Sequence, residues 1–121
     1  MNIEELRNYC LSLAYTSEKL PFDENTLVFY VMGKMFCLTN IEDYSFVNLK
    51  CDPEYAIELR ERYEEISPGY HMNKKHWNSV STIGGISDRM MKSLIDDSYN
   101  LVLKGVPKKV KDSFINDNID F

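Results

Sequence analysis

Residues 26–40 read TLVFYVMGKMFCLTN, and this stretch decides the fold. Two runs rich in β-branched and aromatic residues, 26–31 and 34–40, flank the pair Met32-Gly33. Glycine readily adopts the positive φ that a tight hairpin turn requires, so the pattern predicts two antiparallel strands joined by a short turn. Residues 45–50 then alternate between two sets of side chains, which is the period of a strand with two different faces. The sequence therefore predicts a three-stranded meander.

Helices are predicted before and after this meander in the sequence. Asn2 and Glu5 have the spacing of a capping box, and apolar residues follow at helical spacing, so a first helix should run over about residues 3–13. After the meander, Asp52-Pro53 combines an N-cap acceptor with a proline that suits the first helical turn. A second helix should therefore continue to about residue 65.

The second half of the chain predicts a further hairpin and a third helix. Residues 70–72 and 77–83 are expected as strands around a turn, and Ser87 can cap a helix that ends before Gly105. The resulting order is α-β-β-β-α-β-β-α, with hairpins joining neighbouring strands. This order predicts an α+β fold, in which helices pack on one face of a single antiparallel sheet.

The length of 121 residues fits one domain with its own core. We assign this domain to residues 1–107. Residues 108–121 are mixed and polar without a dependable period, and we expect them to form a weakly ordered tail. The tail contains four apolar residues that could dock on the domain: Phe114, Ile115, Ile119 and Phe121.

Charge is unevenly distributed along the chain, whose formal net charge is -5. Residues 1–66 contain 6 Lys/Arg against 13 Asp/Glu, residues 67–111 contain 8 against 3, and the last ten residues contain 3 acids. Such sorting makes a one-sided basic face possible in an acidic protein, although it also serves solubility.

Several features predict a soluble cytoplasmic protein without a membrane partner. No apolar run approaches the roughly 20 residues of a membrane span, and the N-terminus opens with an acidic amphipathic segment instead of a leader pattern. Cys10, Cys37 and Cys51 show no CxxC spacing and fall within apolar patterns. We expect them to be small buried hydrophobes in a reducing compartment.

The stretch GYHMNKKHWNSV at residues 69–80 is the candidate binding site. It holds both histidines, the only tryptophan and a lysine pair. The candidate residues are Tyr70, His71, Asn73, Lys74, Lys75, His76 and Trp77.

Four segments of the chain resemble the MmcQ/YjbR family: NIEELRNYCLSL, TLVFYVMGKMFCL, VNLKCDPEYAIELRERY and PGYHMNKKHWNSV. The resemblance covers about residues 2–107. It implies a compact fold like that of secretion chaperones and CyaY, in a small cytoplasmic bacterial protein. It also implies DNA binding through a pair of β-hairpin wings, of which residues 69–80 would form the second.

The physical chemistry of this stretch fits two interpretations. For DNA, Lys74 and Lys75 would contact phosphate, Asn73 and His76 would orient the backbone or read a base edge, and Trp77 would anchor the wing. Alternatively, the lysines solvate a turn and the tryptophan belongs to the core. The acidic total weighs against sequence-independent DNA binding.

Neither a metal site nor an active site is expected. His71 and His76 are five residues apart, which suits neither one face of a helix nor one face of a strand, and a third ligand is missing. Ser79 and Ser81 lie in no nucleophile motif, and no phosphate-binding glycine loop follows a strand. We therefore predict a non-enzymatic binding protein without cofactor. DNA is the preferred partner, and the alternative is a protein or peptide captured at a sheet or hairpin edge. The oligomeric state stays open.

Overall fold

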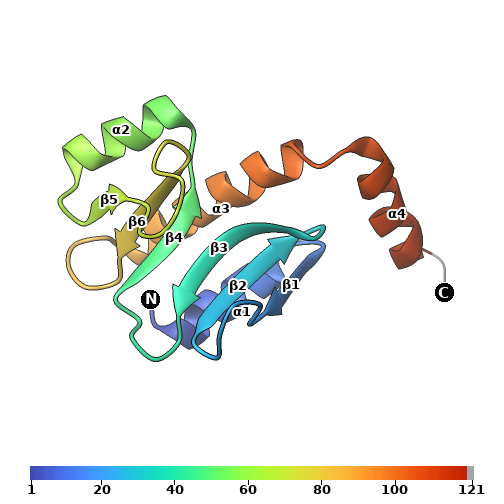
Figure 1. Ribbon diagram of the computed structural model, residues 1–121, viewed down its shortest axis with the longest axis horizontal. Coiled ribbons are helices and arrows are strands. Elements are labelled where there is room, and N and C mark those ends of the chain that lie inside the picture. Colours follow the sequence, from blue (N-terminus) through green and yellow to red (C-terminus); the bar gives the residue numbers. More distant parts are fainter. Residues whose placement is uncertain (120–121) are drawn as a thin grey trace.

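One antiparallel sheet organises the chain in the computed structural model, which describes the backbone of residues 1–119 and the side chains of residues 1–116 (Figure 1). Its strands lie in the order β1-β2-β3-β4-β6-β5. Their bounds are Thr16–Lys19 (β1), Thr26–Val31 (β2), Lys34–Asn40 (β3), Phe46–Lys50 (β4), Ile66–Pro68 (β5) and Trp77–Ser81 (β6). The helices are Ile3–Ser12 (α1), Pro53–Arg62 (α2), Asp88–Lys104 (α3) and Lys108–Ile119 (α4).

The predicted hairpin and helix starts are confirmed. Met32 and Gly33 both have positive φ, 48° and 79°, and Val31 pairs with Lys34 directly across the turn. Each of the first three helices begins at the expected cap, whose side-chain oxygen accepts a backbone N–H three residues later. These caps are Asn2, Asp52 and Ser87.

The strand predicted at residues 70–72 is wrong. These residues lie in turns, where His71 has a φ of 57°, and the first strand of the second hairpin is β5 instead. β1 was not predicted at all. Residues 108–119, expected to lack regular structure, form α4, which projects beyond the end of α3 (Figure 1). Val110, Phe114 and Ile115 of α4 are partly buried against the core, whereas Phe121 lies outside the described residues.

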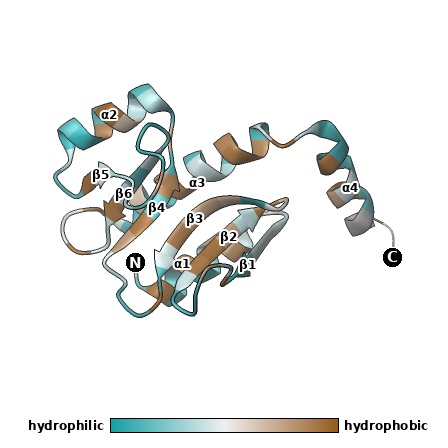
Figure 2. Cartoon of the chain, viewed as in Figure 1, coloured by the Kyte–Doolittle hydropathy of each residue, from teal (hydrophilic) through white to brown (hydrophobic). Residues whose placement is uncertain are grey.

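The main core lies between the sheet and the helices, as the α+β prediction requires. Phe29, Phe36 and Ile95 are fully buried there, and Figure 2 shows the apolar stretches running along β2, β3 and β4. Within this core, Ser98 of α3 donates to the Phe36 carbonyl (2.6 Å) and accepts the Lys50 N–H (2.9 Å), which fastens the helix to two strands.

The three cysteines are free and buried, as predicted. Burial raises the pKa of the Cys37 thiol well above its usual range, and a hydrogen bond with Cys10 adds to this effect. Burial also raises the pKa of Cys51 to about 11. The thiols of Cys37 and Cys51 therefore stay protonated at neutral pH, and all three cysteines pack as small apolar groups.

Candidate binding surface around the loop 69–76

The loop 69–76 joins β5 to β6 and folds across the sheet face that lies opposite the main core. Met72 of this loop packs on a second, smaller core formed by Val28, Leu38 and Trp77. Trp77 is only 8% exposed, so its indole supports the loop and offers no stacking platform. This position agrees with the interpretation of Trp77 as an anchor.

Close packing at the start of the loop requires Gly69. Its N–H donates to the Trp77 carbonyl (2.8 Å), and a Cβ atom at this position would lie 2.7 Å from the Trp77 Cβ. A side chain would therefore force the loop away from the sheet.

The first half of the loop holds Tyr70 by its backbone. The Tyr70 N–H donates to Ser79 Oγ (2.9 Å), and Asn48 Nδ2 donates to the Tyr70 carbonyl (3.1 Å). The Ser79 hydroxyl donates to Asn48 Oδ1 and closes the network. Tyr70 as a residue stays 58% exposed, and its ring has Phe46 edge-on at 5.6 Å and His71 at 4.0 Å between ring centroids. Tyr70 is thus an exposed aromatic ring on a rigid backbone.

The second half of the loop forms a turn that Asn73 caps. Asn73 Oδ1 accepts the N–H groups of Lys75 (2.9 Å) and His76 (3.3 Å), so this side chain is engaged within the turn. The Lys74 ammonium donates to the Gly69 carbonyl (2.9 Å). The Lys75 side chain is exposed, and the His76 carbonyl accepts the Cys51 N–H (2.8 Å).

Arg60 of α2 fastens this turn to the rest of the domain. Its Nε donates to Asn78 Oδ1 (2.6 Å), and its terminal nitrogen donates to the carbonyls of Lys74 and Trp77. No signal in the sequence predicted this contact, because the position of Arg60 is that of an ordinary polar residue of an amphipathic helix.

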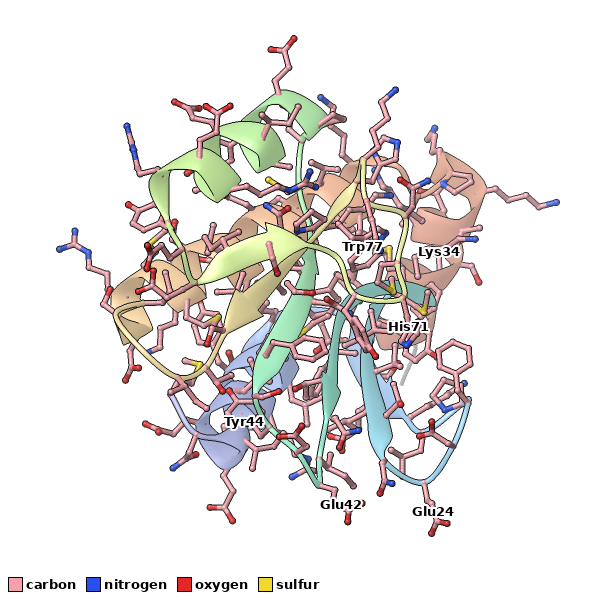
Figure 3. The ribbon with its side chains drawn as sticks, turned by 60° about the vertical axis from the view of Figure 1, so that its left-hand side comes forward. Glu24, Lys34, Glu42, Tyr44, His71 and Trp77 are labelled. Atoms are coloured by element: carbon pink, nitrogen blue, oxygen red, sulfur yellow. The ribbon has the colours of Figure 1, made fainter. Side chains whose placement is uncertain are left out.

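The loop therefore divides the predicted site residues. Tyr70 and His71 lie over the open face of the sheet (Figure 3 labels His71), whereas the lysine pair lies beside the start of β6. Asn73 and Trp77 serve the loop itself.

Strand direction sorts charge to the two ends of the sheet. β3 and β6 begin at one end, where β4 finishes, and we call this the lysine end. The loops at the opposite end, the carboxylate end, carry acids, and Figure 3 shows Glu24 and Glu42 together there, away from Lys34 and Trp77. The lysine end comprises Lys34, Lys50, Lys74 and Lys75, together with two acids near Lys50, namely Asp52 shortly after β4 and Asp97 of α3. The carboxylate end comprises Asp23, Glu24, Glu42, Asp43, Glu64 and Glu65.

Two hollows flank Tyr70 on the open face, and the sequence predicted neither. The first encloses about 370 Å³ and is lined mainly by Phe22, Leu38, Phe46, Tyr70, His71 and Met72. The second has a volume of about 580 Å³ and is lined by Phe46, Glu64, Glu65, Ser67, Tyr70, Ser79, Ser81, Ile83 and Gly84. The Phe46–Tyr70 pair forms a ridge between them.

The serine side chains near the loop make structural contacts. Besides the Ser79 hydroxyl, the Ser81 hydroxyl donates to the Ile83 carbonyl (2.6 Å). Among the described residues, no three His, Cys, Asp or Glu side chains come together as a metal-ion site. Within the same part of the chain, no helix has both the length and the apolar character to cross a membrane.

These features define a class of small α+β domain, in which helices cover one face of a single antiparallel sheet and a hairpin loop covers part of the other. The chain belongs to the YjbR family, whose model matches residues 11–101.

Known relatives agree with this assignment. The chain is 39% identical over 107 residues to the uncharacterised protein YbdF of Escherichia coli O157:H7, and the aligned region covers 88% of each chain. It is 35% identical over 98 residues to the uncharacterised protein YyaQ of Bacillus subtilis, covering 81% of this chain and 79% of that protein. The crystal structure of Deinococcus radiodurans DR2400, with its DUF419 domain, superposes with a TM-score of 0.85 at 38% identity and covers 93% of this chain and 87% of that one.

Proposed function

We propose that this protein is a non-enzymatic binding protein that contacts duplex DNA with the lysine end of its sheet. The observation that carries the proposal is the gathering of Lys34, Lys50, Lys74 and Lys75 at one end of a chain whose net charge is -5. Local positive charge of this kind attracts phosphate even when the whole protein is acidic.

The positions of two hairpin tips support a pair of wings. The β2–β3 turn at Met32-Gly33 and the β5–β6 loop both lie at the lysine end, because β2 and β5 finish there. Two tips on one side of a sheet can follow the backbone of a single duplex. Lys34 of the first tip and Lys75 of the second are exposed and suited to contact phosphate.

Other loop residues have different roles in this proposal. Lys74 contributes charge, but one of its N–H groups holds the Gly69 carbonyl. Asn73 and Trp77 shape the wing and do not read bases, because the first caps the turn and the second is buried. DNA as a partner is consistent with the predicted cytoplasmic location.

The experiment is a titration of fluorescein-labelled 20-base-pair duplex at low salt, followed by anisotropy. The variant Lys34→Ala/Lys75→Ala should bind roughly tenfold more weakly, and the slope of log affinity against log salt should fall by about 1.8, since each phosphate contact adds about 0.9. The matched control is Arg89→Ala/Lys92→Ala, which removes the same charge from the start of α3. Absence of binding by the unmodified protein, or equal losses in both variants, would contradict the proposal.

Protein binding is the second candidate function, and the exposed Tyr70 ring favours it. Strand addition is the mode that the resemblance to secretion chaperones suggests. Of the two sheet edges, β5 has only three residues and ends in Pro68, which has no N–H to donate. An added strand would therefore pair better with β1, the opposite edge. Cross-linking of a bound peptide to β1, mapped by mass spectrometry, tests this mode.

A further inference from the structure

We propose a second binding site on the open face of the sheet, which takes a protein segment carrying lysine or arginine beside an apolar side chain. The site is separate from the lysine end and does not depend on the DNA proposal. It consists of the two hollows and the Phe46–Tyr70 ridge between them.

The first hollow suits an apolar side chain. Phe22 is 65% exposed at its rim, and Leu38 and Met72 lie among its lining residues. Its volume of about 370 Å³ accommodates a large aliphatic or aromatic group. Exposed aromatic rings around a hollow of this kind are typical of sites that bury a partner side chain.

The ridge is held in place before a partner arrives. Three hydrogen bonds among Tyr70, Asn48 and Ser79 fix the backbone that carries the exposed ring. Little conformational entropy is therefore lost when a segment packs against it. A rigid exposed aromatic side chain with a polar tip is a common anchor at protein interfaces.

Charge selects the partner. Glu64 and Glu65 line the second hollow and Asp23 lines the first, whereas no lysine or arginine of the described part of the chain lines either hollow. Glu65 is engaged with the Gly85 N–H (2.9 Å), and Asp23 accepts the N–H groups of Asn25 and Thr26. Glu64, which is exposed, is therefore the carboxylate best placed to receive a cationic side chain.

This pattern distinguishes among occupants. A nucleic acid would meet carboxylates in both hollows, which opposes its binding here. A peptide that crosses the Tyr70 ridge can place an apolar side chain by Phe22 and a cationic side chain by Glu64. Opposite charge and apolar contact then act on neighbouring residues of one segment.

The test is selection of phage-displayed random heptapeptides on the immobilised full chain, followed by anisotropy with the synthetic peptides selected. We expect enrichment of lysine or arginine next to an apolar residue. Tyr70→Ala and Glu64→Gln should each weaken binding of these peptides about tenfold. Phe22→Ser is a further variant, and thermal unfolding of each variant verifies folding. No enrichment, acidic peptides, or peptides whose binding all three variants leave unchanged would overturn the proposal.

The two proposed sites are tested against each other with the same variants. Lys34→Ala/Lys75→Ala should reduce DNA binding and leave peptide binding within about twofold, because those lysines lie outside both hollows. Loss of peptide binding in this variant would contradict a separate site on the open face. Failure of the DNA titration alone would leave the peptide site standing.

Discussion

The two ends of the sheet are built from the same kinds of element, strand termini and the loops between them, yet they differ in charge and in the side chains that support their loops. At the lysine end, the turn 73–76 is fastened to the domain by Arg60 and by the buried Trp77. At the carboxylate end, Glu24 and Glu42 project from loops (Figure 3). The difference shows that strand direction, in addition to sequence position, sorts charge in this fold.

The comparison also explains how an acidic chain can present a basic surface. β3 and β4 run in opposite directions, so Lys34 at the start of β3 and Lys50 at the end of β4 lie toward the same end of the sheet although 16 positions separate them in the sequence. A seven-residue strand such as β3 spans roughly 20 Å. That length exceeds the Debye length of about 8 Å at physiological salt, so the two ends act on partners largely independently.

The largest expected effect is the difference in unfolding free energy between substitutions of Trp77 and Tyr70. Trp77→Ala should lower the free energy of unfolding by about 3–5 kcal/mol, because it empties the small core beneath the loop. Tyr70→Ala should cost about 1 kcal/mol or less, because its ring is exposed. Urea denaturation of both variants measures the difference. Equal losses would mean that Tyr70 is a structural residue and not a contact surface.

Arg60 gives the next largest effect and tests the support of the lysine end. Arg60→Met removes charged hydrogen bonds to Lys74, Trp77 and Asn78, and should lower the free energy of unfolding by about 1–3 kcal/mol. Arg62→Met, on the same helix and exposed, is the control and should stay within about 0.5 kcal/mol. Faster amide exchange in the turn 73–76 should accompany only the first substitution. Unchanged exchange would show that the turn holds its shape without Arg60.

Removing acidic residues from the carboxylate end should change the affinity for DNA only slightly. Glu24→Gln/Glu42→Gln changes the net charge by the same magnitude as Lys34→Ala/Lys75→Ala, but we expect DNA affinity to rise by less than about threefold, because salt screens charges so far apart. Anisotropy at physiological salt provides the comparison. A rise close to tenfold would show that total charge, and not its position, governs binding.

The smallest effect is a pH dependence at the carboxylate end. Hydrogen bonds from the backbone of Asn25 and Thr26, and from the Thr26 hydroxyl, lower the pKa of Asp23 below its usual 3.8. The ionised form therefore stabilises the folded state above pH 3.8, and this contribution is lost as the pH falls through the lowered value. An NMR titration of the Asp23 carboxyl gives its pKa directly. In thermal melts, the difference in Tm between the natural protein and Asp23→Asn should disappear in acid. A difference in Tm that persists at low pH would contradict the carboxylate of Asp23 as the origin of this stabilisation.

Local sequence signals predicted the elements that such signals determine. The Met32-Gly33 turn and the caps at Asn2, Asp52 and Ser87 were found because each depends on residues within a few positions. β1 was missed because the sequence TSEK has no apolar alternation, and its pairing with β2 makes it a strand. β5 was missed because it has only three residues and ends in proline.

The candidate surface was predicted as a segment but not as a shape. The chain places Tyr70 and Lys75 in one stretch, yet contacts distant in sequence direct them to different surfaces. Asn48 is 22 positions from Tyr70, and Arg60 is 14 positions from Lys74. A single sequence does not reveal such pairings, nor the hollows that they create beside Phe22 and Glu64.

Titration of the ¹⁵N-labelled protein with a short DNA duplex, followed by amide chemical shifts, tests the central claim most directly. We predict that shifts concentrate at the lysine end, around Lys34, Lys50 and the turn 73–76, and that amides near Phe22, Glu42 and Glu64 stay unchanged. Shifts concentrated at the carboxylate end, or none at millimolar duplex and low salt, would contradict it.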